Sequence, residues 1–122
     1  MKSIHTDKAP AAIGPYSQGY IAAGLLFTSG QIPADPATGS FPEGIEAQTR
    51  QSCENVKAIV EGAGLSMDQV VKTVCFIADM ADFAVFNTVY AEYFTSKPAR
   101  SCVAVKALPK GALCEIEAIA EA

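Results

Sequence analysis

The sequence predicts a single α+β domain in which two helices cover one face of a sheet. Short β-branched or aromatic runs separated by turn residues predict strands, and two longer segments show the three- and four-residue spacing of amphipathic helices. The predicted order is two strands, a helix, a strand, a helix and two strands. A chain of 122 residues can bury one hydrophobic core but not two, so we expect one domain over residues 1–122.

The first half of the sequence predicts a hairpin, a loop and a helix. Residues 16–23 and 25–29 are expected to form two strands joined at Gly24, the second of them rich in apolar and β-branched residues. Residues 33–39 combine Pro, Asp and Gly, which favour turns, and are expected to form a loop. A helix is predicted over residues 45–63, because apolar or small residues recur there at steps of three and four. These inward-facing positions are Ile45, Thr49, Ser52, Val56, Ile59, Val60 and Ala63.

The middle of the sequence predicts a capped turn, a central strand and a second helix. Ser66 with Gln69 three residues later fits a capping box, and the β-branched run at 70–77 predicts a buried strand. Asp79 is expected to cap a helix over residues 81–94. Four aromatic residues form a stripe along that helix, and such a stripe is expected to be core: Phe83, Phe86, Tyr90 and Phe94.

Two more strands are predicted after Pro98, over residues 101–105 and 113–120, with a turn at 108–111 between them. Two helices can cover only one face of the resulting sheet. Half of the residues are hydrophobic, which is more than a small monomer hides easily. We therefore expect the other face of the sheet to be covered in an oligomer.

Composition and charge argue against several classes of function. The net charge is −4 and the nine Lys and Arg residues are scattered, so nucleic acid is not an expected partner. The chain has one histidine, His5, and four cysteines without a Cys-x-x-Cys pair, so no metal site is expected. The N-terminus has no apolar signal region, and no apolar run approaches membrane-spanning length. We expect reduced thiols in a cytoplasmic protein with no membrane partner.

One pair of residues near the C-terminus suggests chemistry. Arg100 lies at the N-terminal end of the first of the last two strands, in the segment Pro98–Val103, and Glu115 lies in the second, and these strands are expected to be neighbours. A guanidinium group can hold a carboxylate through two parallel hydrogen bonds, and a glutamate can orient or deprotonate water. The pair predicts chemistry on a small carboxylic acid. The alternative is an exposed cross-strand ion pair without a catalytic role, which is the commoner case.

Several segments resemble, in order, the RidA/YjgF family of reactive-intermediate deaminases, and they extend over nearly the whole chain. They are Ala12–Gln18, Thr28–Pro33, Asn55–Ile59, Val71–Thr73, Pro98–Val103 and Glu115–Ala120. The resemblance implies a chorismate-mutase-like α+β subunit that assembles as a homotrimer. In such a trimer the sheets form a central β-barrel, and three clefts lie between neighbouring subunits.

The resemblance also implies an activity, the hydrolysis of 2-imino acids such as 2-iminobutanoate and 2-iminopropanoate to 2-oxo acids and ammonia. It implies no metal and no organic cofactor, since a protonated imine carbon is already electrophilic. Arg100 would bind the substrate carboxylate, and Glu115 would position and activate the attacking water. Two alternatives stay open: a module that binds small carboxylates without catalysis, and the translation-inhibiting or RNA-cleaving activity for which some relatives are named.

Five further residues match positions that line the family's cleft, although each also has an ordinary structural explanation. They are Tyr16, Ser29, Gly30, Asn87 and Cys102. The Tyr16 hydroxyl suits a polar contact at a cleft mouth, and Gly30 lets a ligand approach the backbone, but either residue could simply belong to a strand or its end. Asn87 is a weak helix former within the second helix, so a tertiary contact explains it better than propensity does.

The sequence also gives expectations for other residues near Arg100 and Glu115. Cys102 is expected to line the pocket and not to act as a nucleophile, because no histidine is placed to serve as its base. Glu117 shares a strand face with Glu115, and it either raises the proton affinity of Glu115 or is a solvated carboxylate. Residues 95–97 form a shorter loop than many relatives have, and this loop is expected to border the cleft.

Overall fold

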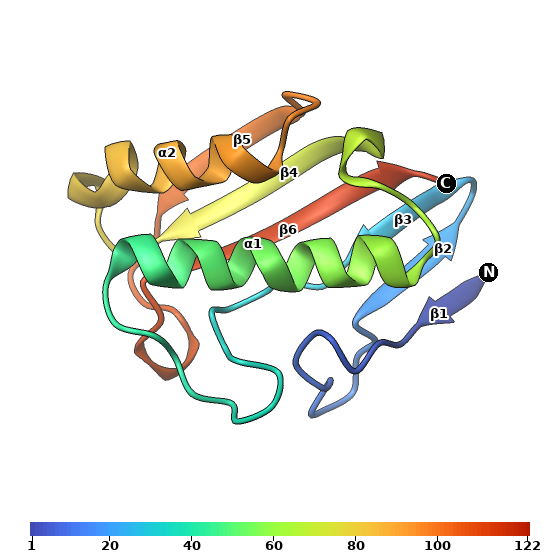
Figure 1. Cartoon of the computed structure of the whole chain (residues 1–122), viewed down its shortest axis with the longest axis horizontal. Coiled ribbons are helices and arrows are strands. Elements are labelled where there is room, and N and C mark those ends of the chain that lie inside the picture. Colours follow the sequence, from blue (N-terminus) through green and yellow to red (C-terminus); the bar gives the residue numbers. More distant parts are fainter.

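Six strands form one mixed sheet in the computed structural model, which describes residues 1–122 (Figure 1). The strands are β1 (Lys2–Ile4), β2 (Gly19–Ala22), β3 (Leu25–Thr28), β4 (Val70–Ile77), β5 (Ala99–Ala104) and β6 (Cys114–Glu121). Their order across the sheet is β1-β2-β3-β6-β4-β5. Only β4 and β5 run parallel, and every other neighbouring pair is antiparallel.

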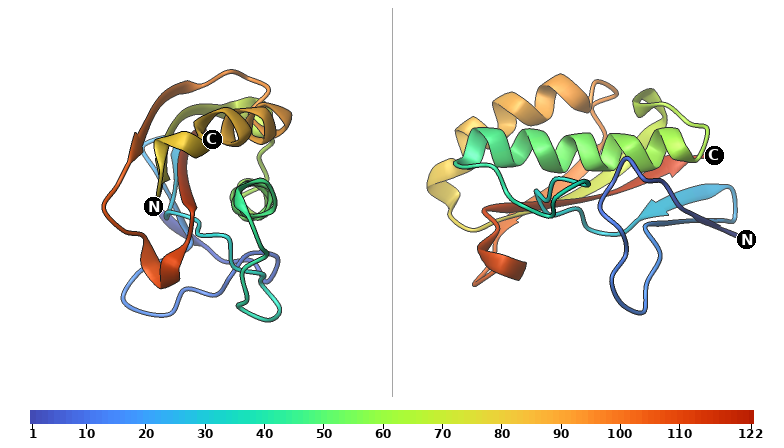
Figure 2. Two further views of the ribbon diagram at one scale, coloured as in Figure 1. Left: turned by 90° about the vertical axis from the view of Figure 1, so that its left-hand side faces the viewer. Right: turned by 60° about the horizontal axis from the view of Figure 1, so that its bottom comes forward.

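Two helices, α1 (Ile45–Gly62) and α2 (Phe83–Tyr93), lie on the same face of the sheet (Figure 2). Three short 3₁₀ turns complete the chain: η1 (Met67–Gln69), η2 (Met80–Asp82) and η3 (Pro109–Gly111). The core lies between this helical layer and the sheet, and α2 with the residue that follows it contributes three stacked aromatic residues to it: Phe86, Tyr90 and Phe94. The predicted α+β class with two helices on one face is confirmed. No helix of the structure is long and apolar enough to cross a membrane.

Local signals set the boundaries of the helices. Gly64, with φ of 80°, reverses the chain after α1. The backbone N–H of Ser66 donates a 2.9 Å hydrogen bond to Oε1 of Gln69, as the predicted capping box requires. Asp79 accepts a 2.9 Å hydrogen bond from the backbone N–H of Ala81 and so caps the 3₁₀ turn η2. Because η2 leads directly into α2, the regular α-helix begins two residues later than predicted.

The strands differ from the prediction at the N-terminus. The sequence does not predict β1, which is short and exists by pairing with β2. β2 begins at Gly19 and not at Tyr16, so Tyr16 lies in the loop that leads into the sheet. The hairpin turn that follows contains Ala23 and Gly24, with φ of 53° and 75°. Positive φ at both central residues matches the twist of the flanking strands.

The sheet face without helices carries exposed apolar side chains. Tyr20, Phe27 and Val103 are 40%, 41% and 46% exposed. Tyr20 is the cross-strand partner of Phe27, and Phe27 is the partner of Ile119 in β6, so this apolar surface extends across three adjacent strands.

Candidate active site

Arg100 and Glu115 lie on strands that are not neighbours, so the prediction of adjacent strands is wrong. β4 lies between β5 and β6 and pairs with both. The reason is the connection through α2: a strand, a helix and a strand in succession form a parallel crossover pair, so β5 takes one edge of β4 and leaves the other edge to β6. Arg100 is paired with Thr73 of β4, and Glu115 is paired with Phe76.

The two side chains also lie on opposite faces of the sheet. Residues that are paired across neighbouring strands share a face. Thr73, the partner of Arg100, is fully buried and its hydroxyl group contacts α2, so Arg100 lies on the helix-covered face. Phe76, the partner of Glu115, belongs to the alternate β4 residues that point to the open face. Within one chain, Arg100 and Glu115 therefore cannot contact the same small molecule.

The Arg100 guanidinium group is held against α2. Its Nη1 donates a 2.7 Å hydrogen bond to Oδ1 of Asn87. Its Cζ lies 4.8 Å from the ring centroid of Tyr90 and 5.5 Å from that of Phe83, which are distances typical of cation–π contacts. No carboxylate of the chain forms an ion pair with Arg100. Since a guanidinium group has several N–H donors, Arg100 retains donors for a ligand.

A pocket of about 570 Å³ lies beside Arg100, where α2 ends and β5 begins. Asn87 and Arg100 line it together with Thr95 and Lys97 of the short loop before β5. No Asp or Glu residue lines this pocket. Its two charged side chains are thus both cations, which suits an anionic ligand.

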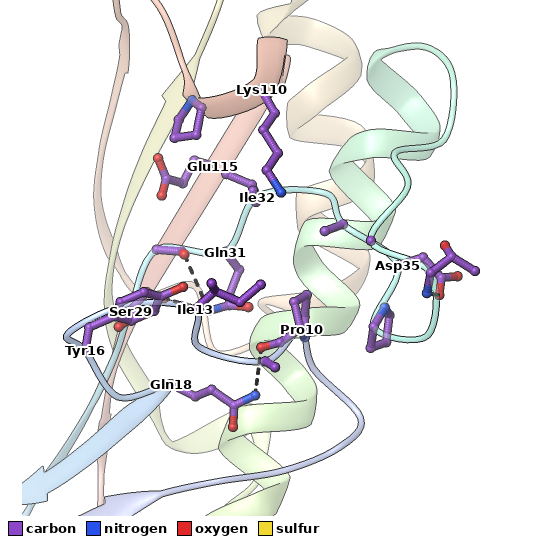
Figure 3. Close-up of a pocket in the computed structure, with 17 residues that line it drawn as sticks. Pro10, Ile13, Tyr16, Gln18, Ser29, Gln31, Ile32, Asp35, Lys110 and Glu115 are labelled. Carbon is purple, nitrogen blue, oxygen red and sulfur yellow. Dashed lines mark hydrogen bonds between the residues drawn. The ribbon is translucent and has the colours of Figure 1, made fainter.

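A second pocket, of about 730 Å³, contains Glu115 (Figure 3). Tyr16, Ser29 and Gly30 line it too, so the structure brings four of the predicted cleft residues together. Figure 3 shows Tyr16 and Ser29 on one side of this pocket, with Glu115 and Lys110 on the other. Asn87 and Arg100 belong to the first pocket, and the predicted cleft residues are thus divided between two sites.

Gly30 lies directly against the carboxyl group of Glu115. A Cβ atom at position 30 would come within 2.9 Å of Cδ of Glu115, which is closer than real Cβ atoms approach other heavy atoms. The φ of Gly30 is not in the left-handed region, so backbone conformation does not require a glycine here. The glycine instead leaves the space that the Glu115 carboxyl group occupies.

Two effects raise the pKa of Glu115 above the ordinary value for a glutamate. The larger is burial, which disfavours the charged form, and the smaller is the negative charge of Glu117 on the same strand face. Of the two interpretations of Glu117, this favours an electrostatic effect on Glu115. A carboxyl group with a raised pKa can both accept and return a proton at a pH closer to neutrality.

Buried polar side chains fix the loops around the Glu115 pocket. Nε2 of Gln18 donates to three carbonyl oxygens of residues 6–10, and its Oε1 accepts a 2.7 Å hydrogen bond from a backbone N–H in that loop. The Ser29 hydroxyl donates a 2.6 Å hydrogen bond to the carbonyl oxygen of the residue preceding Gln18. Nδ2 of Asn55 in α1 donates to two carbonyl oxygens of residues 32–34, at 3.1 and 2.9 Å. These contacts preorganise the pocket wall.

The last predicted cleft residue, Cys102, lines neither of these two pockets. It is partly buried and follows Arg100 on the helix-covered face of β5. Burial raises the pKa of its thiol, with a smaller opposing effect from Arg100, so the thiol stays protonated at neutral pH. Cys102 is therefore not an activated nucleophile.

Two residues that the sequence indicates only as core, Phe83 and Tyr90, contact Arg100. A signal for them is present in their spacing. Phe83, Asn87 and Tyr90 follow one another at steps of four and three, which places them on one stripe of a helix. Asn87 interrupts an aromatic stripe, and a polar residue in that position indicates that the stripe faces a polar group.

The fold and the two pockets define the class of protein. It is a small α+β protein with one helical layer on a single sheet, an arginine without an acidic partner on one face and a half-buried glutamate on the other. The chain belongs to the RidA/YjgF family: residues 6–122 match the family model described as Endoribonuclease L-PSP. The family resemblance of the sequence is confirmed.

Curated relatives and solved structures agree with this assignment. The chain is 55% identical to a 2-iminobutanoate/2-iminopropanoate deaminase of Salmonella typhimurium, over 98% of this chain and 96% of the relative. Among solved structures, Escherichia coli TdcF with bound serine has a TM-score of 0.96 and 50% identity, and covers 100% of this chain and 99% of its own. The Escherichia coli YjgF gene product has a TM-score of 0.95 and 52% identity, and the match covers 99% of this chain and 98% of that one.

Proposed function

We propose that this protein hydrolyses 2-imino acids, such as 2-iminobutanoate and 2-iminopropanoate, to 2-oxo acids and ammonia. The observation that carries the proposal is the Arg100 guanidinium group, which has no acidic partner and lies in a pocket without carboxylates. Such a group fits the carboxylate of a small acid. The Salmonella and Escherichia coli relatives named 2-iminobutanoate/2-iminopropanoate deaminase, at 55% and 54% identity, supply the substrate class. TdcF, described with bound serine, supports a cleft for a small amino-acid-like ligand.

In this reaction Arg100 binds and orients the substrate, and Glu115 moves protons. The water oxygen attacks C2 of the protonated imine while Glu115 accepts a proton from that water. The product of this step is a 2-amino-2-hydroxy acid. Glu115 then returns the proton to the amino nitrogen and the C2–N bond breaks, its electron pair leaving with ammonia. The hydroxyl proton passes to the ammonia as the C2 carbonyl forms.

A complete site needs two copies of the chain in this proposal. Arg100 and Glu115 lie on opposite faces of one sheet, so Arg100 of one subunit would meet Glu115 of its neighbour. The apolar side chains exposed on the open face, such as Tyr20 and Phe27, support an assembly that buries them. We propose a cytoplasmic homotrimer with the open sheet faces in a central barrel and three clefts between subunits, each lined by Tyr16, Ser29 and Gly30 of one chain and Asn87 of another.

The first test is the rate of 2-oxobutanoate formation from threonine by a threonine dehydratase, with and without this protein. We expect the wild type to accelerate the reaction. Arg100→Ala should lower kcat/KM by about 30- to 1000-fold, since a lost charged hydrogen-bond pair costs about 2 to 4 kcal/mol. Arg50→Ala is the matched control, because Arg50 is an exposed arginine that pairs with Glu92 at 3.1 Å. Full activity in Arg100→Ala would contradict the proposal.

Two other outcomes would point elsewhere. Tight binding of 2-oxobutanoate with no acceleration by the wild type would identify a carboxylate-binding module. RNA cleavage that Arg100→Ala removes would favour the nuclease named in the family description, although a net charge of −4 offers little attraction for phosphates.

A further inference from the structure

We infer that Tyr90 is a positioning residue that sets the location and orientation of the Arg100 guanidinium group. This inference rests on the proposed function, in which Arg100 holds the carboxylate of the substrate. Tyr90 lines the pocket beside Arg100, but in that proposal it touches neither the substrate carbon nor the attacking water and acts through Arg100.

The ring of Tyr90 is the nearer of the two aromatic faces beside Arg100. Cζ of Arg100 lies 4.8 Å from the Tyr90 centroid, against 5.5 Å for Phe83. The hydrogen bond to Asn87 holds only one of the guanidinium nitrogens. A planar guanidinium group tied at one nitrogen can still tilt, and an adjacent aromatic face restricts that tilt. Bidentate binding of a carboxylate requires such a restriction, because both donors must lie in one plane with the ligand.

The Tyr90 ring is itself tied to the strand beside Arg100. Its hydroxyl group forms a 2.7 Å hydrogen bond with Oγ1 of Thr73, and both residues are buried. Thr73 is the cross-strand partner of Arg100 in the parallel pair of β4 and β5. The contacts therefore form a closed cycle: Arg100 contacts Tyr90, Tyr90 bonds Thr73, and Thr73 is paired with Arg100 through the backbones of β4 and β5. A shift of α2 relative to the sheet would break this cycle of contacts.

The surroundings of Tyr90 suit a fixed and uncharged support. Its ring stacks on Phe94 at 4.3 Å and on Phe86 at 5.9 Å between centroids. Burial raises the pKa of Tyr90 to about 12, so the phenol carries no charge that would attract Arg100 away from a ligand. For packing alone a phenylalanine would serve at position 90, as it does at 86 and 94. The hydroxyl group is the part that packing does not explain.

The chain offers a matched control on the same helix. Tyr93 also faces an arginine, with its ring centroid 6.0 Å from Cζ of Arg50, and Arg50 is paired with Glu92 on the surface. Tyr93→Phe removes a hydroxyl group beside an arginine in the same way as Tyr90→Phe, but outside the proposed site.

The experiment measures the Kd of 2-oxobutanoate by titration calorimetry, together with turnover at a saturating supply of imine and the melting temperature. We expect Tyr90→Phe to raise the Kd by about 3- to 10-fold, as one neutral hydrogen bond is lost, with turnover within about 2-fold of wild type. Thr73→Val should raise the Kd similarly. The double variant should raise it little further, because both substitutions remove the same hydrogen bond between Thr73 and Tyr90. Tyr93→Phe should leave the Kd unchanged.

Two results would overturn the inference. One is a wild-type Kd in Tyr90→Phe when Arg100→Ala abolishes binding; this leaves the proposed function intact. The other is a rise in Kd that accompanies an equal fall in melting temperature in both Tyr90→Phe and Tyr93→Phe. That result would indicate a purely structural role for Tyr90. Normal turnover in Arg100→Ala would instead overturn the proposed function and, with it, the premise that Tyr90 supports a catalytic arginine.

Discussion

Arg100 and Arg50 show how similar side chains can have different roles. Arg50 is exposed and pairs with Glu92 through two hydrogen bonds of 3.3 and 3.1 Å. Arg100 is partly buried, and its neighbours in the chain are an amide oxygen and two aromatic faces. A partly buried charge without a charged partner is costly, and an anionic ligand would supply the missing opposite charge. The surroundings of Arg100 are therefore typical of a binding site.

The raised pKa of Glu115 predicts the pH dependence of turnover. Only the ionised carboxyl group can accept a proton from water, so activity should rise with pH through the raised pKa, after correction for spontaneous hydrolysis. Glu117→Gln removes one of the two causes of the shift, so the pKa of Glu115 should fall and the acid limb of the profile should move to lower pH. Glu121→Gln, at the exposed end of β6, is the control. An acid limb that stays in place would show that Glu117 has no such effect.

The contact between the segment after β3 and strand β6 predicts the effect of a side chain at position 30. Gly30→Ala would force the Glu115 carboxyl group away from its place, because the new Cβ would overlap it. If Glu115 has the proposed catalytic role, we expect turnover to fall by about 10- to 100-fold, since small misplacements of a catalytic group have large effects. The Kd of 2-oxobutanoate should change less than turnover, because Arg100, which holds the carboxylate in the proposal, is untouched.

A double variant separates crowding of Glu115 from other effects of Gly30→Ala. If the substitution acts through Glu115, the variant with both Gly30→Ala and Glu115→Gln should be no slower than Glu115→Gln alone. A large additional loss would show that Gly30 serves another purpose, such as close approach of the ligand to its backbone.

Most elements could be predicted from the sequence because their signals are local. The spacing of apolar residues gave α1, and the β-branched run gave β4 at its observed bounds. β1 could not be predicted, since three residues at an end of the chain become a strand only by pairing with β2. The alternation of side chains along a strand also predicted correctly which residues of one strand share a face. It could not tell that Arg100 and Glu115 lie on opposite faces, because that depends on the register of both strands against β4.

At the scale of the whole molecule, the proposed sharing of the site between subunits predicts complementation between inactive variants. An Arg100→Ala chain retains Glu115, and a Glu115→Gln chain retains Arg100, so mixed assemblies contain some intact clefts. In the proposed trimer, random mixing of equal amounts of the two chains should recover about a quarter of the wild-type activity. The measurement is 2-oxobutanoate formation by co-expressed, differently tagged variants.

The control for complementation pairs Arg100→Ala with the double variant that also carries Glu115→Gln, since no assembly of these two chains has an intact cleft. If the first mixture is as inactive as this control, both residues must act from the same chain, or not at all. That result would contradict the proposed arrangement of the site.

The position of β4 between β5 and β6 has a consequence for the electrostatics of the unassembled subunit. An arginine and a glutamate in one open cleft would attract each other and form an ion pair, and a substrate would then have to displace that pair. Here a full layer of backbone separates the two charges, and no side-chain rotation can bring them together. The sheet thus keeps the cation and the anion of one subunit apart, so that neither charge neutralises the other within the chain.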